Sequence, residues 1–305
     1  MTKPKALRPG SVIRLVSPAS PMTPEKTQPF AKMMEEAGYG IELSDHVFEV
    51  DYYLAGADAD RAADIQRAFD APNVDAVMCT RGGYGCARLM PYLDLDRMAA
   101  SGKMFLGFSD ITTLHIALNR RGLVTAHAPM ALTFTVEREP WVRESFLAAL
   151  KGDNPIPPTA SRGTTLRGGK AEGVVTGGCL CLLTDSIGTP DPLDCRGKIL
   201  LIEDVDEHPH RIDAMLTHLR LSGILQEAAG IVIGEMTRTD EKADESIGSR
   251  PWREIVRDRL SGLDVPTIVD FPFGHCKNML TLPLGIRAEL DADAGTLTYT
   301  ESLCA

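Results

Sequence analysis

The chain has 305 residues, of which 44% are hydrophobic and 24% are charged, so its composition is that of a globular protein and not of a disordered one. Its formal net charge of −10 argues against a nucleic-acid-binding protein, which would carry a basic face. No apolar run approaches membrane-spanning length, and the amino-terminal residues lack the apolar core of a signal peptide, so we expect a cytoplasmic protein.

Strands and helices alternate through residues 1–150, which predicts an α/β domain whose parallel sheet is covered on both faces. The predicted elements, in chain order, are a strand at 12–17, helices at 27–38 and 58–69, a strand at 74–80, a helix at 87–92 and a strand at 104–108. A further helical pattern begins directly after this last strand.

The amino-acid composition changes after residue 150. Residues 151–170 are rich in Pro, Gly, Ser and Thr and are expected to form a linker. Residues 171–305 then predict a smaller α/β domain with a mixed sheet. Its expected elements are strands at 198–202 and 230–236, a helix with an apolar stripe at positions 212, 215, 216 and 219, and a hairpin formed by 286–290 and 297–300.

The seven cysteines are an odd number without a C-x-x-C pair, which indicates reduced thiols and not a disulfide framework or a zinc knuckle. Cys179, Leu180 and Cys181 alternate as residues of a strand would, and Cys276 follows His275. Neither spacing matches a metal-binding motif, so a metal site is the disfavoured alternative and we expect none.

Ser109 stands where the apolar run 104–108 ends and the next helix begins. A helix cap is the ordinary role for such a residue, because its hydroxyl accepts a hydrogen bond from an unpaired N–H of the first turn. A strand-to-helix turn also holds the hydroxyl of a nucleophilic serine, beside backbone amides that stabilise an oxyanion. Local sequence alone favours the cap.

Residues 81–85, RGGYG, form another predicted strand-to-helix turn. Glycine allows backbone N–H groups there to approach an anion closely. The spacing is neither the dinucleotide fingerprint nor a phosphate-binding loop, and a tight turn without a ligand explains it equally well.

A nucleophilic serine requires an imidazole to accept its proton and a carboxylate to orient the imidazole. His127 follows a predicted strand, and His275 lies in a predicted loop. Functional residues are common at both kinds of position, so the sequence alone does not favour one histidine over the other. Glu203 ends a buried strand and is the candidate carboxylate, although a solvated turn before the next helix is the more common role at such a position.

Five segments taken together resemble the LD-carboxypeptidases, a serine peptidase family that also contains the microcin C immunity peptidases. They are RGGYG at 81–85, GFSD at 107–110, IGTP at 187–190, LLIEDV at 200–205 and FPFGHC at 271–276. The similarity runs in order over almost the whole chain, from about residue 7 to residue 290.

The resemblance implies a catalytic triad of Ser109, Glu203 and His275, and an oxyanion hole formed by the amides of Gly83 and Asp110. It implies an enzyme of cell-wall recycling that releases the terminal D-alanine from a murein tetrapeptide, a small-molecule substrate. No metal or organic cofactor is implied, and the protein is expected to be a homodimer. By position alone, Arg81 is a candidate to bind the terminal carboxylate of the substrate.

The sequence departs from the family pattern at Cys179, where the family has asparagine, and at Ala128, where it has glycine. One alternative is a microcin-type amidase that cleaves aminoacyl nucleotide analogues. Those relatives carry a longer stretch between the serine and the glutamate, with a tryptophan that stacks on the base. Here the stretch is short and contains a single tryptophan, Trp141, which favours the carboxypeptidase. The other alternative, a catalytically inactive two-domain ligand-binding protein, is disfavoured by the intact triad residues.

Overall fold

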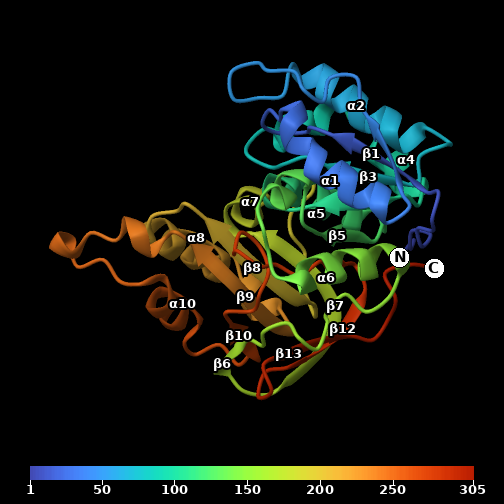
Figure 1. Ribbon diagram of the computed structural model, residues 1–305. Helices are drawn as coiled ribbons and strands as arrows, with labels where there is room; N and C mark the ends of the chain where they lie inside the picture. Colours follow the sequence, from blue (N-terminus) through green and yellow to red (C-terminus); the bar gives the residue numbers. More distant parts are fainter. The chain divides into compact units, whose positions relative to one another are not determined.

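The computed structural model describes residues 1–305 with the exception of the side chain of Glu245. The chain forms two compact units. The first comprises Met1–Pro157, Leu280–Gly285 and Ser302–Ala305, and the second comprises Pro158–Met279 and Ile286–Glu301. Both termini therefore belong to the first unit, where the Ala305 N–H donates a hydrogen bond to the Pro4 carbonyl at 2.9 Å (Figure 1).

The first unit is built on a six-stranded sheet with the order β11-β5-β4-β3-β1-β2. Its strands are β1 Val12–Val16, β2 Gly40–Leu43, β3 Ala76–Cys79, β4 Met104–Gly107, β5 Thr125–His127 and β11 Leu282–Leu284. Strands β1 to β5 are parallel, and β11 runs antiparallel to β5. The chain steps from β1 to β2 in one direction and then to β3 in the other, so the order reverses between β1 and β3. In open α/β sheets, ligands bind at the carboxyl ends of the strands at such a point.

Helices cover both faces of this sheet. They are α1 Pro24–Glu36, α2 Asp58–Asp70, α3 Cys86–Leu89, α4 Leu95–Ala100, α5 Thr112–Arg120 and α6 Pro140–Lys151, with short 3₁₀ helices η1 Met90–Tyr92, η2 Ser109–Ile111 and η3 Ala131–Thr135. Phe30 of α1 contacts Phe146 of α6, whereas Phe69 of α2 contacts Phe105 of β4. These two aromatic clusters lie on opposite faces, because right-handed connections that step in opposite directions along a sheet cross on opposite sides.

The second unit contains a seven-stranded sheet with the order β13-β12-β7-β8-β9-β10-β6. Its strands are β6 Thr164–Arg167, β7 Lys170–Cys179, β8 Ile199–Val205, β9 Gly230–Thr237, β10 Thr267–Val269, β12 Arg287–Asp291 and β13 Thr296–Tyr299. The four strands from β7 to β10 are parallel, and antiparallel strands pair at both edges. The predicted mixed sheet is thereby confirmed.

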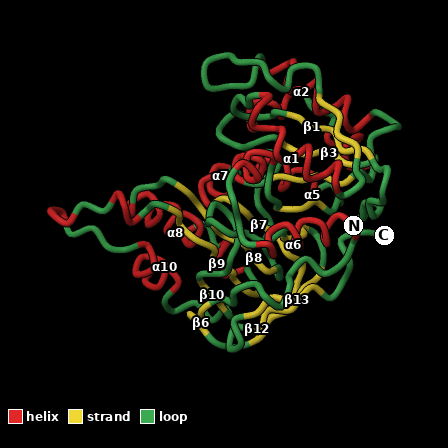
Figure 2. The backbone as a smooth tube through the Cα atoms, in the orientation of Figure 1, coloured by secondary structure: helices red, strands yellow, loops and turns green.

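The helices of the second unit are α7 Leu180–Asp185, α8 Pro209–Leu221, α9 Ile224–Glu227 and α10 Trp252–Leu260, with 3₁₀ helices η4 Asp240–Lys242 and η5 Glu245–Ile247. Helix α8 packs against α7 and α10 (Figure 2). Its predicted apolar stripe is confirmed, since Ile212, Met215, Leu216 and Leu219 are all buried. Among the residues that the structure describes, no helix is both long enough and apolar enough to span a membrane.

The α/β class with two domains is confirmed, but the units differ from the predicted boundaries at 150 and 170. Part of the expected linker is β6, which pairs with β10 as an edge strand. Two segments of the expected second domain, Leu280–Gly285 and Ser302–Ala305, belong to the first unit, where Leu282 and Cys304 are buried. Composition alone does not reveal where such short segments pair.

The expected alternation through Cys179, Leu180 and Cys181 is wrong. Strand β7 ends at Cys179 and helix α7 begins at Leu180. The chain therefore turns between the two cysteines, which changes what their side chains contact.

Candidate functional site

Ser109 lies at the turn from β4 into η2 with a φ of 67°, and its side chain is half-buried. A positive φ is strained for a residue with a side chain, and such strain is concentrated at functional sites. A serine held on a sharp turn between a strand and a helix is also the arrangement that exposes a nucleophilic hydroxyl. The conformation of Ser109 goes beyond what an ordinary helix cap requires.

The loop after β3 lies directly against Ser109. A Cβ atom added to Gly82 would stand 2.8 Å from the Ser109 Cβ and 3.3 Å from the backbone nitrogen of Asp110. A Cβ atom added to Gly83 would stand 2.6 Å from the Cβ of Ser20, in the loop after β1. The loops after β1, β3 and β4 therefore converge at the point where the strand order reverses. Gly82, which the sequence analysis did not single out, is the glycine in contact with Ser109.

A buried arginine on α2 contacts both the loop after β1 and the loop after β3. The Arg61 guanidinium donates hydrogen bonds to the carbonyls of Pro18, Gly56 and Gly85 and forms an ion pair with Asp58. Arg61 is not among the site residues predicted from the sequence, although the sequence carries a signal for it. Its position matches the helical spacing of the buried residues Ile65, Ala68 and Phe69, and a charge at a core position requires buried partners.

The side chains of Asp110 and Arg81 both bind backbone groups. The Asp110 carboxylate accepts a hydrogen bond from the Cys86 N–H at 2.8 Å and so connects η2 to the start of α3. The Arg81 guanidinium donates to the carbonyls of Gly82 at 3.2 Å and Pro21 at 3.4 Å. Burial lowers the pKa of Arg81 from its usual value. Arg81 therefore braces the glycine loop in addition to any contact it makes with a substrate.

In the second unit, Glu203 and His275 form a hydrogen-bonded pair. The Nδ1–H of His275 donates to Oε2 of Glu203 at 2.7 Å, and the backbone N–H of His275 donates to the same oxygen at 3.2 Å. Glu203 is fully buried, while the His275 side chain is 17% exposed. With the proton on Nδ1, the Nε2 atom of the neutral imidazole is an acceptor, which is the tautomer that a general base requires.

The backbone approaches the Glu203 side chain closely at two glycines. Gly274 has a φ of +87°, and a Cβ atom there would stand 2.5 Å from the carboxyl carbon of Glu203. A Cβ atom on Gly234 of β9 would stand 3.1 Å from the Glu203 Cβ. The register of β8 and β9 also shifts between Ile202 and Asp204, as at a β-bulge, and bulges reorient side chains next to functional sites.

The charges around this pair shift two pKa values. Burial by itself lowers the pKa of His275, but the charge of Glu203, the hydrogen bond to it and the charges of Asp204 and Asp206 together outweigh burial, so that the pKa is raised. Burial, together with the charge of Glu203, raises the pKa of Asp204 to about 7. The imidazolium form of His275 is therefore stabilised by its carboxylate partner.

The structure thus separates the candidate residues into two groups. Ser109, Gly83, Asp110 and Arg81 lie in the first unit, and Glu203 and His275 lie in the second. His127, the other candidate imidazole, is fully buried at the end of β5, with its ring centroid 5.5 Å from that of Phe108. The hydrogen bond to Glu203 distinguishes His275.

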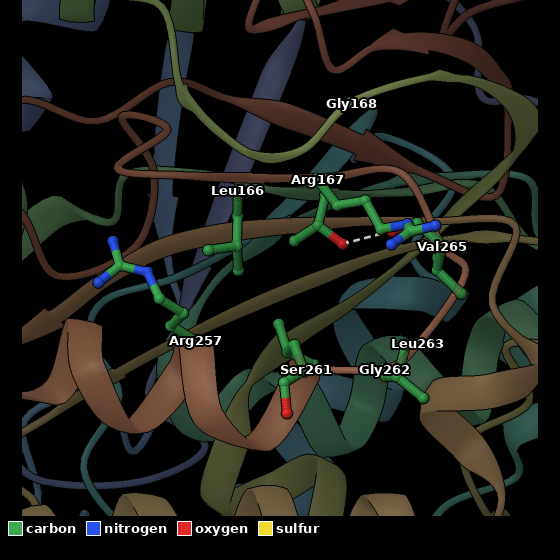
Figure 3. Close-up of a pocket in the computed structure, with 10 residues that line it drawn as sticks. Leu166, Arg167, Gly168, Arg257, Ser261, Gly262, Leu263 and Val265 are labelled. Atoms are coloured by element: carbon green, nitrogen blue, oxygen red, sulfur yellow. Dashed lines mark hydrogen bonds between the residues drawn. The ribbon is translucent and has the colours of Figure 1, made fainter.

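A pocket of about 530 Å³ lies elsewhere in the second unit, at the edge of its sheet (Figure 3). Its walls come from the end of β6, the end of α10 and the loop that leads to β10. The lining residues are Leu166, Arg167, Gly168, Arg257, Leu260, Ser261, Gly262, Leu263, Val265 and Thr267. None of the predicted site residues is among these ten, so this pocket is not the candidate active site.

Comparison with known proteins identifies the family. Residues 13–128 match the LD-carboxypeptidase N-terminal domain, and residues 172–290 match the LD-carboxypeptidase C-terminal domain. A putative carboxypeptidase of Streptomyces coelicolor is 42% identical, over 100% of this chain and 98% of that protein.

Solved structures agree with this result. The muramoyltetrapeptide carboxypeptidase of Oxalobacter formigenes has a TM-score of 0.82 and 30% identity, over 94% of this chain and 97% of that chain. The microcin C7 self-immunity protein MccF, as an inactive mutant in the apo state, has a TM-score of 0.88 and 25% identity over 100% of both chains. The chain belongs to the LD-carboxypeptidase family and is a serine-type carboxypeptidase.

Proposed function

We propose that this enzyme hydrolyses the L,D-peptide bond that joins the terminal D-alanine to a murein tetrapeptide, with Ser109, Glu203 and His275 as its catalytic triad. The observation that carries the proposal is the buried Glu203–His275 pair, whose geometry suits a general base that a serine nucleophile requires. The strained turn at Ser109 supports the assignment of the nucleophile.

In the proposed reaction, the Ser109 Oγ attacks the carbonyl carbon of the scissile bond while its proton passes to Nε2 of His275. The Glu203 carboxylate stabilises the resulting imidazolium through the Nδ1–H hydrogen bond. His275 then donates the proton to the leaving amine, which departs as D-alanine and leaves an acyl ester on Ser109. Water, deprotonated by His275, hydrolyses that ester and restores the serine hydroxyl.

The amides of Gly83 and Asp110 are the proposed donors to the oxyanion of the tetrahedral intermediates. Support comes from the contact of the glycine loop with Ser109 and with the Asp110 nitrogen. Arg81 is the proposed partner of the terminal carboxylate. Arg81→Ala is expected to raise KM, and unchanged values of KM and kcat would remove Arg81 from the site.

A microcin-type amidase activity is the second candidate, favoured by the full-length structural similarity to MccF. The short stretch between Ser109 and Glu203, with Trp141 as its single tryptophan, argues for the carboxypeptidase instead. The two activities differ in the leaving group, which is a free amino acid in one case and, in the other, a nucleotide analogue that has lost its aminoacyl group.

The deciding experiment incubates the purified protein and its Ser109→Ala variant with a murein tetrapeptide and measures D-alanine by mass spectrometry. We expect release by the wild-type protein and none by the variant, with thermal melting confirming that both are folded. Release by the variant would contradict the assignment of Ser109. If neither protein releases D-alanine, an aminoacyl sulfamoyl adenosine is the next substrate, and its cleavage would establish the amidase.

The expected homodimer and the expected cytoplasmic location are also proposals. The homodimer rests on the family resemblance, and the location rests on the sequence, in which no apolar run approaches membrane-spanning length. Light scattering on the purified protein measures the first, and a dimer mass is the expected result. Fractionation of the native host cells measures the second.

A further inference from the structure

Two cysteines and an aspartate come together at one end of the second sheet, beside the Glu203–His275 pair but not part of it. Cys179 ends β7, Cys181 lies in the first turn of α7, and Asp204 lies in β8. The two Sγ atoms are 3.4 Å apart, and the Cys179 Sγ is 3.6 Å from Oδ1 of Asp204. One ligand atom from each of the three residues lies within 4.8 Å of the others.

These separations suit ligands of one tetrahedral cation. With a zinc–sulfur bond of about 2.3 Å and a zinc–oxygen bond of about 2.0 Å, tetrahedral angles place two sulfur ligands about 3.8 Å apart, and a sulfur and an oxygen about 3.5 Å apart. The distance from the Cys179 Sγ to Oδ1 of Asp204 agrees closely with this geometry. The distance between the two Sγ atoms would have to increase by a few tenths of an ångström. Two thiolates and a carboxylate form a donor set typical of zinc.

The backbone already orients the carboxylate. The N–H of Cys181 donates to Oδ2 of Asp204 at 2.9 Å, and the N–H of Val205 donates to Oδ1 at 2.7 Å. Hydrogen bonds of this kind fix the direction of a metal ligand before the metal binds. Cys179 and Asp204 are almost completely buried, whereas Cys181 is partly exposed and provides a route for entry.

We propose that Cys179, Cys181 and Asp204 bind a thiophilic divalent cation, Zn²⁺ in the first instance, with a water molecule as the fourth ligand. Binding releases the protons of the two thiols to solvent, because the metal-bound form is the thiolate. The cation would fasten the start of α7 to the end of β7 and to β8. Cys179 is the register partner of Glu203, so the metal would stabilise the strand end that carries the candidate triad carboxylate.

The test is a titration of the full-length reduced protein with Cd²⁺, followed by the ultraviolet charge-transfer band of cadmium thiolates, and then competition with Zn²⁺. We expect one Cd²⁺ per chain, displaced by Zn²⁺. Cys179→Ser, Cys181→Ser and Asp204→Asn should each weaken binding by more than about 100-fold, since even the loss of a hydrogen bond to a ligand costs about 10- to 100-fold. The matched control, Cys195→Ser, alters another buried thiol of the same unit and should bind as the wild type does.

Thermal melting provides a second readout in case a variant is unstable. Zn²⁺ should raise the Tm of the wild-type protein, of Cys195→Ser and of Ser109→Ala, and should leave that of Asp204→Asn unchanged. Ser109→Ala separates this inference from the proposed reaction, because it removes the proposed nucleophile and keeps the three ligands. Absence of a charge-transfer band in the reduced wild-type protein would overturn the proposal, as would an equal band in the Cys179→Ser variant.

Discussion

At the scale of single residues, the candidate site combines a backbone conformation and a buried charge that are both unfavourable in an unconstrained chain. Ser109 has a positive φ, and Glu203 is a fully buried carboxylate whose charge is held by His275. Each of these features has an energetic cost that the surrounding structure must offset. The proposed reaction explains their occurrence together, because strain would expose Ser109 as a nucleophile and burial would strengthen the action of the Glu203 carboxylate on the imidazole.

The raised pKa of His275 predicts how the activity depends on pH. As the proposed general base, His275 must be neutral, so kcat/KM should fall on the acid side with an apparent pKa above the ordinary value of about 6.5. In Glu203→Gln the charge that raises the pKa is lost while burial, which lowers it, stays, so this acid limb should move to lower pH. The plateau of kcat/KM should also fall by about 10²- to 10⁴-fold. The measurement is the pH profile of tetrapeptide hydrolysis, and an unmoved acid limb would contradict the pairing.

Gly274→Ala should destabilise the protein by about 2–5 kcal/mol. The left-handed φ costs about 1–2 kcal/mol for a residue with a Cβ atom, and overlap of that atom with the Glu203 carboxyl group adds about 1–3 kcal/mol. Gly223→Ala is the matched control, because its φ is +81° and a Cβ atom there meets nothing within 4 Å. Denaturant unfolding measures both free energies. Equal losses for the two variants would mean that Gly274 matters for its backbone alone.

At the scale of elements, three loops meet where the first sheet reverses its strand order, and a buried arginine ties two of them to α2. The Arg61 guanidinium donates hydrogen bonds to the carbonyl of Pro18, after β1, and to that of Gly85, after β3. The loop after β4 is held in turn by the bond of Asp110 to Cys86. Ser109, the proposed nucleophile, is therefore positioned by contacts between loops as well as by its own strand.

Gly82→Ala should reduce kcat/KM by about 100-fold with a small loss of stability. The new Cβ atom would stand 2.8 Å from that of Ser109, and a displacement of this proposed nucleophile by about 1 Å is sufficient for such a loss. Gly40→Ala in β2 is the control, since a Cβ atom there makes only ordinary contacts, at 3.5 Å or more. Steady-state kinetics on the tetrapeptide gives the comparison. Full activity of Gly82→Ala would show that the loop does not constrain Ser109.

The elements that the sequence predicted well are those with a strong internal pattern. The stripe of α8 and the apolar run before Ser109 report burial directly, and the structure confirms both elements. The turn between Cys179 and Cys181 was mispredicted because the glycines nearest to it, Gly177 and Gly178, lie inside β7, and the strand continues to Cys179 before α7 begins. No local pattern indicated Asp204 as a neighbour of the two cysteines either. That proximity depends on the pairing of β7 with β8.

At the scale of the whole molecule, the chain crosses between its two units several times. After building most of the second unit it returns to the first to form β11, goes back to form β12 and β13, and ends in the first unit. The returning segments are well integrated there. Leu282 and Leu284 of β11 are buried beside β5, and the tail places Leu303 and Cys304 in the core. The stability of the first unit should therefore depend on residues that lie far from it in sequence.

Removal of Ser302–Ala305 tests this dependence. The deletion eliminates the hydrogen bond from Ala305 to Pro4 and the bond from the Ser302 hydroxyl to the Gly152 carbonyl, and it exposes the core that Cys304 covers at the end of α6. Amide hydrogen exchange, measured by mass spectrometry, should accelerate in the amino-terminal segment and in α6, because local opening there needs less free energy. Helices α8 and α10, which belong wholly to the second unit, should exchange as they do in the intact chain. Deletion of Ala305 alone should produce a smaller effect confined to the segment around Pro4. Equal acceleration in both units would mean instead that they unfold as a single cooperative body, and that the interleaved path of the chain couples their stabilities.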